Sequence, residues 1–358
     1  MSANLEPGSH YISSSADGPV SGHGPYRVEP LRYYFEHAPV KFHSEMGAPN
    51  VPEMEMLRRT MPESALWPQG SEWPLHDFYP QNPFKDAVEK NYGGATDIAD
   101  WDGLAQFVDY DAYRGMYEGQ SKNRLGLLIW MSHPAWPSLL WQTYDYFFDT
   151  DAGYYGAKKG AEPLHIEWNA ATDAVEVVNY SSGAQTGLTA HAEVLGLDGA
   201  VKWEKRATLD SSEDSTVAPF KMEFPAGLAE THFIRLTLKR GDEVLSSNFY
   251  LHGVKEQDYA GIRTLPRVKV SAVTHLERHG VEWVLATELH NAGTAPALMV
   301  RVKAVRAKTG DPIVPALYDD NYVALMPAER RTIHARVLDA DTRGEMPRIV
   351  VNGFNLAE

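Results

Sequence analysis

The residue best suited to chemistry in this sequence is Glu45, within the run Phe42-His43-Ser44-Glu45-Met46-Gly47. Val40 and Phe42 predict a strand of period two, which Gly47 and Pro49 end in a turn. Glu45 would then lie at the carboxyl end of a strand, where barrels of alternating strands and helices carry their catalytic groups. A carboxylate there can act as a general acid, a base or a nucleophile. The alternative reading of the motif is a solvated glutamate in a loop.

Two tryptophans form a second candidate group. The unbroken apolar run Leu125–Met131 predicts a strand buried on both faces, as in a parallel sheet. Trp130 lies at the end of this run, and Trp136 follows in the next loop. If this strand is parallel to the one before Glu45, both tryptophans reach the same edge as the carboxylate. Indole rings there would suit the apolar face of a sugar, and a place in the hydrophobic core is the alternative for each.

The elements that must position these residues alternate between strands and helices. The residues His10–Ser15 predict a strand, which a long glycine-rich loop follows as far as Tyr26. Asn50 is predicted to cap a helix that buries Met54, Met56 and Leu57. Further helices are predicted over residues 97–122, 139–147 and 152–159.

Beyond Pro163 the apolar residues alternate strictly, which predicts a domain boundary. Short strands separated by turn signals are expected at 174–180, 189–195, 233–239 and 246–251. A second set of such strands follows Pro266. This pattern predicts two antiparallel sandwiches of immunoglobulin type, so we divide the chain into residues 1–163, 164–262 and 263–358.

Composition limits the classes of function. The chain has 358 residues, 43% of them hydrophobic, and a formal net charge of -15. This charge argues against nucleic acid and anionic membranes as partners. The sequence has no cysteine, and its fourteen histidines show no metal-binding spacing, so we expect no metal site. The opening residues have neither the basic nor the apolar region of a secretory signal, and no stretch is long enough to span a bilayer.

Several motifs resemble glycoside hydrolase family 2, in its branch of exo-β-D-glucosaminidases and β-mannosidases. The resemblance covers nearly the whole chain. It is carried by the run around Glu45, by Leu127–Met131, by Ala135–Gln142 and by Ala152–Ile166. Near the end, Tyr318-Asp319-Asp320-Asn321 and Val350–Asn355 are similar to the last sandwich domain of the exo-β-glucosaminidases.

The resemblance implies the C-terminal half of a (β/α)8 TIM barrel, followed by two immunoglobulin-like β-sandwich domains. It implies a retaining hydrolysis of terminal β-linked glucosamine or mannose, with no cofactor. Glu45 would be the nucleophile, and Trp130 and Trp136 would border the sugar site. Tyr26 would belong to the same rim.

The family's acid/base glutamate has no counterpart before Glu45 in this sequence. We therefore expect a second polypeptide to supply the other half of the barrel, because an incomplete barrel exposes edge strands and apolar surface. The alternative is a catalytically inactive fragment, or a subunit that binds carbohydrate or has a structural role.

Overall fold

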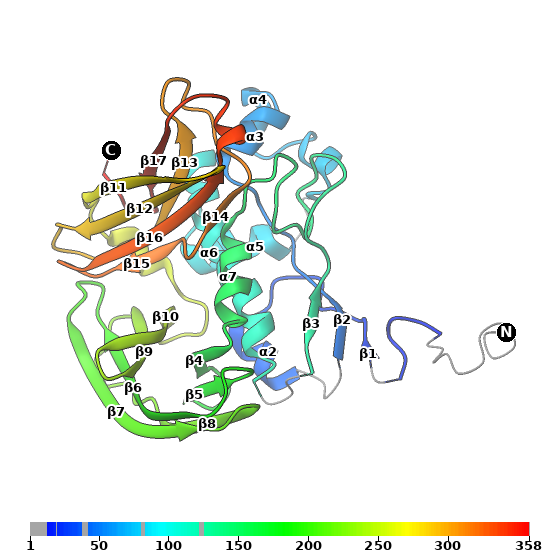
Figure 1. Cartoon of the computed structure of the whole chain (residues 1–358). Helices are drawn as coiled ribbons and strands as arrows, with labels where there is room; N and C mark the ends of the chain where they lie inside the picture. Colours follow the sequence, from blue (N-terminus) through cyan, green and yellow to red (C-terminus); the bar gives the residue numbers. More distant parts are fainter. Residues whose placement is uncertain (1–12, 19, 38–41, 80–82, 122–124, 358) are drawn as a thin grey trace, which may run out of the picture.

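The computed structural model describes residues 13–18, 20–37, 42–79, 83–121 and 125–357 (Figure 1). Its first part mixes helices with a small parallel sheet, and β-sandwich sheets follow. No helix among the described residues is long and apolar enough to cross a membrane. The elements of the first part are β1 (Val20–Ser21), α2 (Leu31–His37), β2 (Phe42–Met46), α3 (Met54–Thr60), α4 (Glu63–Leu66), η1 (Trp73–His76), α5 (Pro83–Tyr92), α6 (Ile98–Glu118), β3 (Leu127–Ile129) and α7 (Ala152–Gly160).

The parallel sheet has the strand order β1-β2-β3. Val20 pairs with Phe42 on one side of β2, and His43 pairs with Leu127 on the other. The predicted strand before Glu45 and its parallel partner after residue 125 are therefore both present. The strand predicted at His10–Ser15 is wrong for its described residues 13–15, which form bends and a turn, and its first three residues lie outside the described range.

The expectation that Leu125–Met131 is buried on both faces is wrong. Only Leu127–Ile129 forms a strand, and the side chains of Leu125 and Leu128 are 53% and 55% exposed. Among the described residues β3 pairs with β2 alone, so one edge of β3 stays open. This sheet therefore presents apolar side chains that no described element covers.

Three of the predicted helices are present in the structure, and the helix predicted over 139–147 is not. Helices α3, α6 and α7 lie where helices were expected, although α3 begins at Met54 rather than next to Asn50. The helix predicted over 139–147 is wrong. The side chain of Asp145 there accepts hydrogen bonds from the backbone N–H groups of Phe147 and Asp149, which holds the chain in turns instead of a helix.

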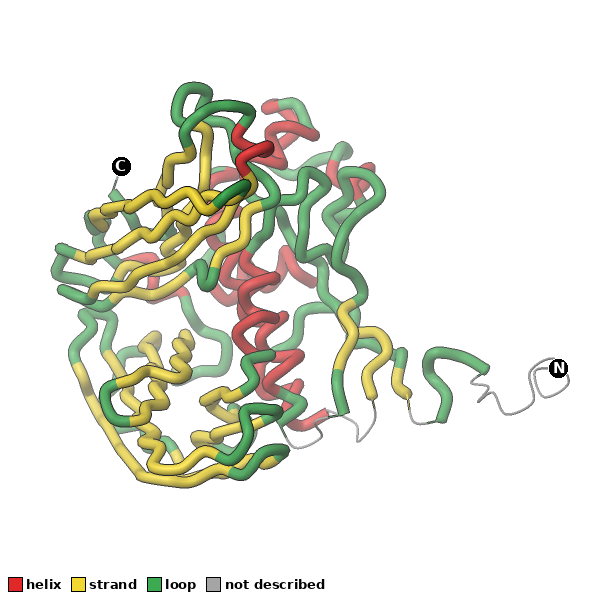
Figure 2. Tube along the Cα trace, viewed as in Figure 1, coloured by secondary structure: helices red, strands yellow, loops and turns green. Residues whose placement is uncertain are grey.

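Helices α6 and α7 occupy the middle of the molecule, between the parallel sheet and the sandwich strands (Figure 2). Their closest approach is at Gly156, where a Cβ atom would lie 2.1 Å from the carbonyl oxygen of Tyr110. Only glycine permits this spacing, because any side chain would meet the backbone of α6. The pair therefore links the parallel sheet to both sandwiches.

The second part contains four antiparallel or mostly antiparallel sheets, as the alternating pattern predicted. The first sandwich combines the sheets β10-β9-β6-β7 and β4-β5-β8, and the second combines β11-β12-β16-β14 and β15-β13-β17. The bounds are β4 (Leu164–Asn169), β5 (Ala174–Asn179), β6 (Gln185–Leu195), β7 (Val201–Ser211), β8 (Ser215–Lys221), β9 (Thr231–Arg240), β10 (Glu243–Gly253), η2 (Ala260–Thr264), β11 (Val270–His279), β12 (Glu282–Asn291), β13 (Ala297–Arg306), β14 (Ala316–Tyr318), β15 (Val323–Leu325), β16 (Arg330–Leu338), η3 (Asp339–Thr342) and β17 (Pro347–Asn352).

The last sandwich is attached to the helical part by a buried ionic cluster. Arg301, on β13, lies 3.0 Å from Glu53 and 2.9 Å from Asp149. The hydroxyl of Tyr322 also donates a hydrogen bond to Glu53, at 2.7 Å. Glu53 precedes α3, so this cluster holds the segment that leaves the parallel sheet after Glu45.

A histidine pair in the first sandwich makes its stability depend on pH. His252 Nδ1 lies 2.7 Å from His232 Nε2, and its ring stacks on Phe224 with centroids 4.4 Å apart. Burial, followed by the charge of His232, lowers the pKa of His252 from 6.5 to about 3. As the pH falls, the unfolded chain therefore binds a proton at His252 before the folded chain does. The contribution of His252 to the free energy of unfolding is complete above pH 6.5 and decreases as the pH drops toward 3.

We expect this histidine alone to lower the free energy of unfolding by about 1 kcal/mol between pH 7.5 and pH 5.5. Denaturant titrations across this range would measure the change. His252→Phe should flatten the pH slope, and the substitution His275→Asn at an exposed position should leave the slope unchanged. Equal slopes for the parent and His252→Phe would contradict the assignment.

Candidate active site

Glu45 is the penultimate residue of β2, the central strand of the parallel sheet. Its side chain is partly exposed at the carboxyl end of the strand. Gly47, two residues after Glu45, lies in a fully buried segment. A Cβ atom on Gly47 would lie 2.1 Å from the carbonyl oxygen of Trp130. The chain after Glu45 therefore passes directly against the end of β3.

Tyr26 contacts Glu45 directly. Its hydroxyl lies 2.9 Å from Oε2 of Glu45 and 2.8 Å from the carbonyl oxygen of Gly22, so its proton has two acceptors. Burial, together with the hydrogen bond and the charge of Glu45, raises the pKa of Tyr26 to about 12. Tyr26 is therefore a hydrogen-bond donor to this carboxylate at neutral pH.

The structure places Trp130 near Glu45 and places Trp136 against a different element. The backbone N–H of Trp130 donates to the carbonyl of Met46, and its side chain is 39% exposed. Trp136 is 44% exposed, and its ring stacks on His76 with centroids 6.2 Å apart. Both rings can be reached from solvent, as a sugar-stacking surface requires.

Sequence reasoning missed Trp141 as a candidate site residue. Its ring lies 5.6 Å from the ring of Tyr26, and its carbonyl accepts from the N–H of Met131, after the end of β3. Trp141 was assigned to a helix that does not form, which concealed its position. Its place within the matching run Ala135–Gln142 was the available signal.

Polar side chains of α6 hold the segment that follows Glu45. Tyr113 donates a hydrogen bond to the carbonyl of Ala48 at 2.9 Å, and Asp109 accepts from the N–H of Val51 at 3.1 Å. Asn50, predicted as a helix cap, donates instead to Asp151 at 2.8 Å. The end of β2 is therefore fixed by buried hydrogen bonds, which favours a well-defined position for Glu45.

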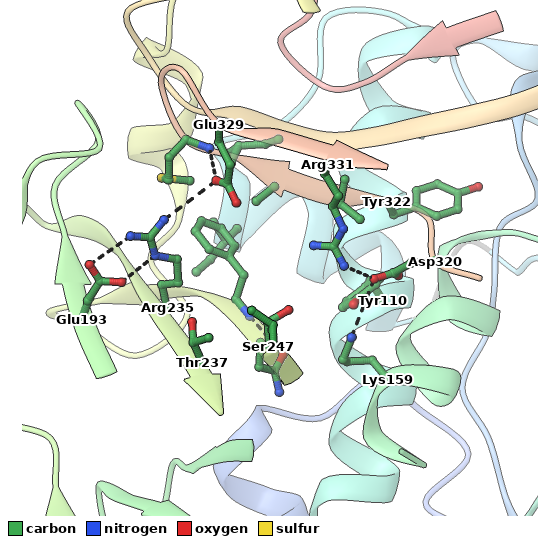
Figure 3. A pocket seen from close by; sticks show the side chains of 18 of the residues that line it. Tyr110, Lys159, Glu193, Arg235, Thr237, Ser247, Asp320, Tyr322, Glu329 and Arg331 are labelled. Carbon is green, nitrogen blue, oxygen red and sulfur yellow. Dashed lines mark hydrogen bonds and ion pairs between the residues drawn. The ribbon is translucent and has the colours of Figure 1, made fainter. Parts of the chain in front are cut away.

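A separate cavity of about 690 Å³ lies where α6 and α7 meet both sandwiches (Figure 3). Arg235 pairs with Glu193 at 2.6 Å and lies 3.8 Å from Glu329, and Arg331 pairs with Asp320. The Arg235–Glu193 and Arg331–Asp320 pairs each lie within one sandwich, and the Arg235–Glu329 contact crosses between the two sandwiches. Glu45 does not line this cavity, so we place the candidate site at the end of the parallel sheet.

Comparison with known proteins identifies relatives of the chain. A family model described as the exo-beta-D-glucosaminidase Ig-fold domain matches residues 248–356. The exo-beta-D-glucosaminidase of Streptomyces avermitilis is 31% identical to this chain, over 97% of this chain and 44% of that protein. The mannosylglycoprotein endo-beta-mannosidase of Lilium longiflorum is 24% identical, over 94% of this chain and 44% of that protein.

Solved structures give the same relationship. The exo-chitosanase CsxA of Amycolatopsis orientalis superposes with a TM-score of 0.87 at 28% identity, over 94% of this chain and 45% of that chain. Another structure of CsxA is a complex with PNP-beta-D-glucosamine. The chain thus spans less than half the length of the relatives that it matches. It is a partial match to the exo-β-D-glucosaminidases and β-mannosidases of glycoside hydrolase family 2, with an immunoglobulin-fold domain at residues 248–356.

Proposed function

We propose that this chain supplies the nucleophile of a retaining β-glycosidase, and that Glu45 is that nucleophile. The observation that carries the proposal is the position of Glu45 at the carboxyl end of the central parallel strand, hydrogen-bonded to Tyr26. The exposed ring of Trp130, just after the neighbouring strand β3, supports a sugar as the ligand, and the exposed ring of Trp136, stacked on His76, offers a second stacking surface.

In this mechanism a carboxylate oxygen of Glu45 forms a bond to the anomeric carbon while the glycosidic C–O bond breaks. A second carboxylic acid protonates the departing oxygen. Water then attacks the anomeric carbon of the covalent intermediate, gives a proton back to that second group, and releases Glu45. The two carboxyl groups must lie about 5 Å apart in a retaining enzyme.

We also propose that β1, β2 and β3 are three strands of an eight-stranded barrel, which a second polypeptide completes and supplies with the acid/base. The open edge of β3 and the exposed side chains of Leu125, Leu128 and Met131 support this arrangement. The barrel part would comprise residues 1–163, followed by sandwich domains over 164–262 and 263–358.

Terminal β-linked glucosamine is the substrate that we favour. The first relatives are exo-β-D-glucosaminidases, and CsxA binds PNP-beta-D-glucosamine in a solved complex. The net charge of -15 suits the approach of a cationic polymer of glucosamine. Mannose is the second substrate to test, because the Lilium longiflorum relative is a mannosidase.

The test is to co-express this chain with the part of CsxA that it does not match, and to assay aryl β-glucosaminide and aryl β-mannoside. We expect a complex in native mass spectrometry together with turnover. Leu128→Glu should weaken the complex, whereas Leu317→Glu, at an equally exposed position of the last sandwich, should not. Binding of glucosamine oligomers without turnover would favour the carbohydrate-binding alternative, and neither binding nor turnover would contradict both proposals.

Tyr26→Phe tests the role of the hydroxyl next to Glu45. The substitution keeps the ring and its contact with Trp141 but removes the donor to the carboxylate. A hydrogen bond to a charged group contributes about 1.5–3 kcal/mol, so we expect kcat of the assembled enzyme to fall by about 10- to 100-fold. Unchanged kcat and KM would show that Tyr26 has no part in the reaction.

A further inference from the structure

We propose that Glu118, His165 and Glu167 form a buried binding site for one divalent metal ion of the Zn²⁺ or Mn²⁺ kind, separate from the candidate active site. Glu118 is the last residue of α6, and the other two residues lie on β4. His165 and Glu167 are two residues apart, but Glu118 lies 47 residues before His165, so the sequence spacing alone did not indicate the site.

The geometry places three ligand atoms around one point. Nε2 of His165 lies 3.1 Å from Oε1 of Glu118 and 3.9 Å from Oε2 of Glu167, and all three atoms are within 4.8 Å of one another. His165 and Glu167 share one face of β4 because side chains alternate along a strand. All three side chains are completely buried. One imidazole and two carboxylates are a donor set that Zn²⁺ and Mn²⁺ accept, with water completing the coordination.

The hydrogen bonds around His165 orient its free nitrogen toward these carboxylates. Nδ1 lies 3.0 Å from Oε2 of Glu162, so a proton on Nδ1 leaves the lone pair of Nε2 directed at Glu118. Metal-binding histidines commonly have such a carboxylate behind them. Asn248 and Tyr250 donate to Oε1 of Glu118 at 2.6 and 2.9 Å, and Asn248 Nδ2 is also 3.3 Å from Nε2.

A second observation is that no donor among the described residues meets strict hydrogen-bond geometry at either oxygen of Glu167 or at Oε2 of Glu118. Ser121 and Glu176 are close enough to influence the pKa of Glu167, and Nε2 of His165 lies 3.9 Å from its Oε2. Glu167 faces Glu176 across the sheet, whereas the oxygens of Glu176 accept from Ser121 and Asn169. An uncompensated buried carboxylate costs several kcal/mol, so a positive species is expected next to Glu167.

Protons are the competing explanation. Burial and the neighbouring glutamates raise the pKa of Glu167, and hydrogen bonds to Glu118 and Glu162 raise the pKa of His165. A neutral Glu167 next to a charged imidazole would then replace the metal. The two explanations predict opposite results for Glu167→Gln, because an amide can replace a protonated carboxyl but is a poor metal ligand.

The experiment uses the full chain, produced with Zn²⁺ and separately with Mn²⁺ in the medium. We expect about one metal ion per chain by elemental mass spectrometry. Glu167→Gln should lower the metal content at least tenfold and lower the melting temperature, and Glu223→Gln, at an exposed position, should change neither. Metal-free parent protein, with Glu167→Gln at least as stable as the parent, would overturn the site in favour of protons.

Refolding provides a measurement that does not depend on the variant. The parent chain is unfolded in denaturant with a chelator and refolded with the chelator, with added Zn²⁺ or with added Mn²⁺. We expect one of the two metals to raise the melting temperature of the refolded chain above that obtained with the chelator. Equal melting temperatures in all three conditions would overturn the proposal whether or not the glycosidase proposal holds.

Discussion

Replacing Glu45 by Gln in the assembled enzyme should lower kcat for the favoured aryl glycoside by about 10⁴-fold or more. Glutamine has nearly the same shape but cannot form the covalent intermediate, so the reaction loses its nucleophile. A fall of this size corresponds to about 5 kcal/mol of transition-state stabilisation. Steady-state kinetics and the detection of a trapped glycosyl intermediate on the parent enzyme would measure the effect.

The control for this experiment is Glu36→Gln, an exposed glutamate at the end of α2 that pairs with Arg32 at 3.3 Å. It should retain full activity, because a surface ion pair contributes little. Turnover of Glu45→Gln within tenfold of the parent would mean that the nucleophile is another residue. Circular dichroism of both variants should match the parent.

Replacing Arg301 by Met should lower the free energy of unfolding by about 3–5 kcal/mol. Methionine keeps much of the side-chain volume but removes the positive charge between Glu53 and Asp149. Both carboxylates would then be left without the partner that offsets their burial. Urea denaturation, followed by tryptophan fluorescence, would measure the loss.

Arg278→Met is the matched control, because Arg278 lies in the same sandwich and pairs with Asp339 at 2.7 Å on the surface. The side chain of Arg278 is 53% exposed, so its removal should cost less than about 1 kcal/mol. Similar losses for the two variants would show that burial does not strengthen the Arg301 cluster. The Arg301 variant should also unfold in two steps if the last sandwich separates from the helical part.

The strand before Glu45 could be predicted because its signal is local. Phe42 and the turn residues from Gly47 onward set its period and its end, and the structure gives Phe42–Met46. The same holds for α6 and for the sandwich strands, where long periodic patterns leave one choice of element. The two strands pair in parallel, which is the condition under which Trp130 was expected at the same edge as Glu45.

The contacts around Glu45 could not be predicted, because they depend on tertiary structure. Tyr26 reaches Glu45 from a loop. The side chain of Asn50 donates a hydrogen bond to Asp151 instead of capping a helix. Trp141 reaches Tyr26 only because Asp145 turns the chain away from a helix. Local propensity cannot predict contacts between side chains that are 19 to 101 residues apart in the sequence.

The ionic cluster at Glu53 also determines when the molecule can finish folding during its synthesis. Tyr322 and Glu53 are separated by 269 residues, which ribosomes translate in about 13 to 54 s at ordinary rates. Throughout that interval Glu53 lacks Arg301 and Tyr322, whereas Tyr113 and Asp109 of α6 are already available to hold the segment after Glu45. Attachment of the last sandwich at Glu53 is therefore a late step of folding, and a ribosome that stops before Arg301 releases a chain in which this attachment cannot form.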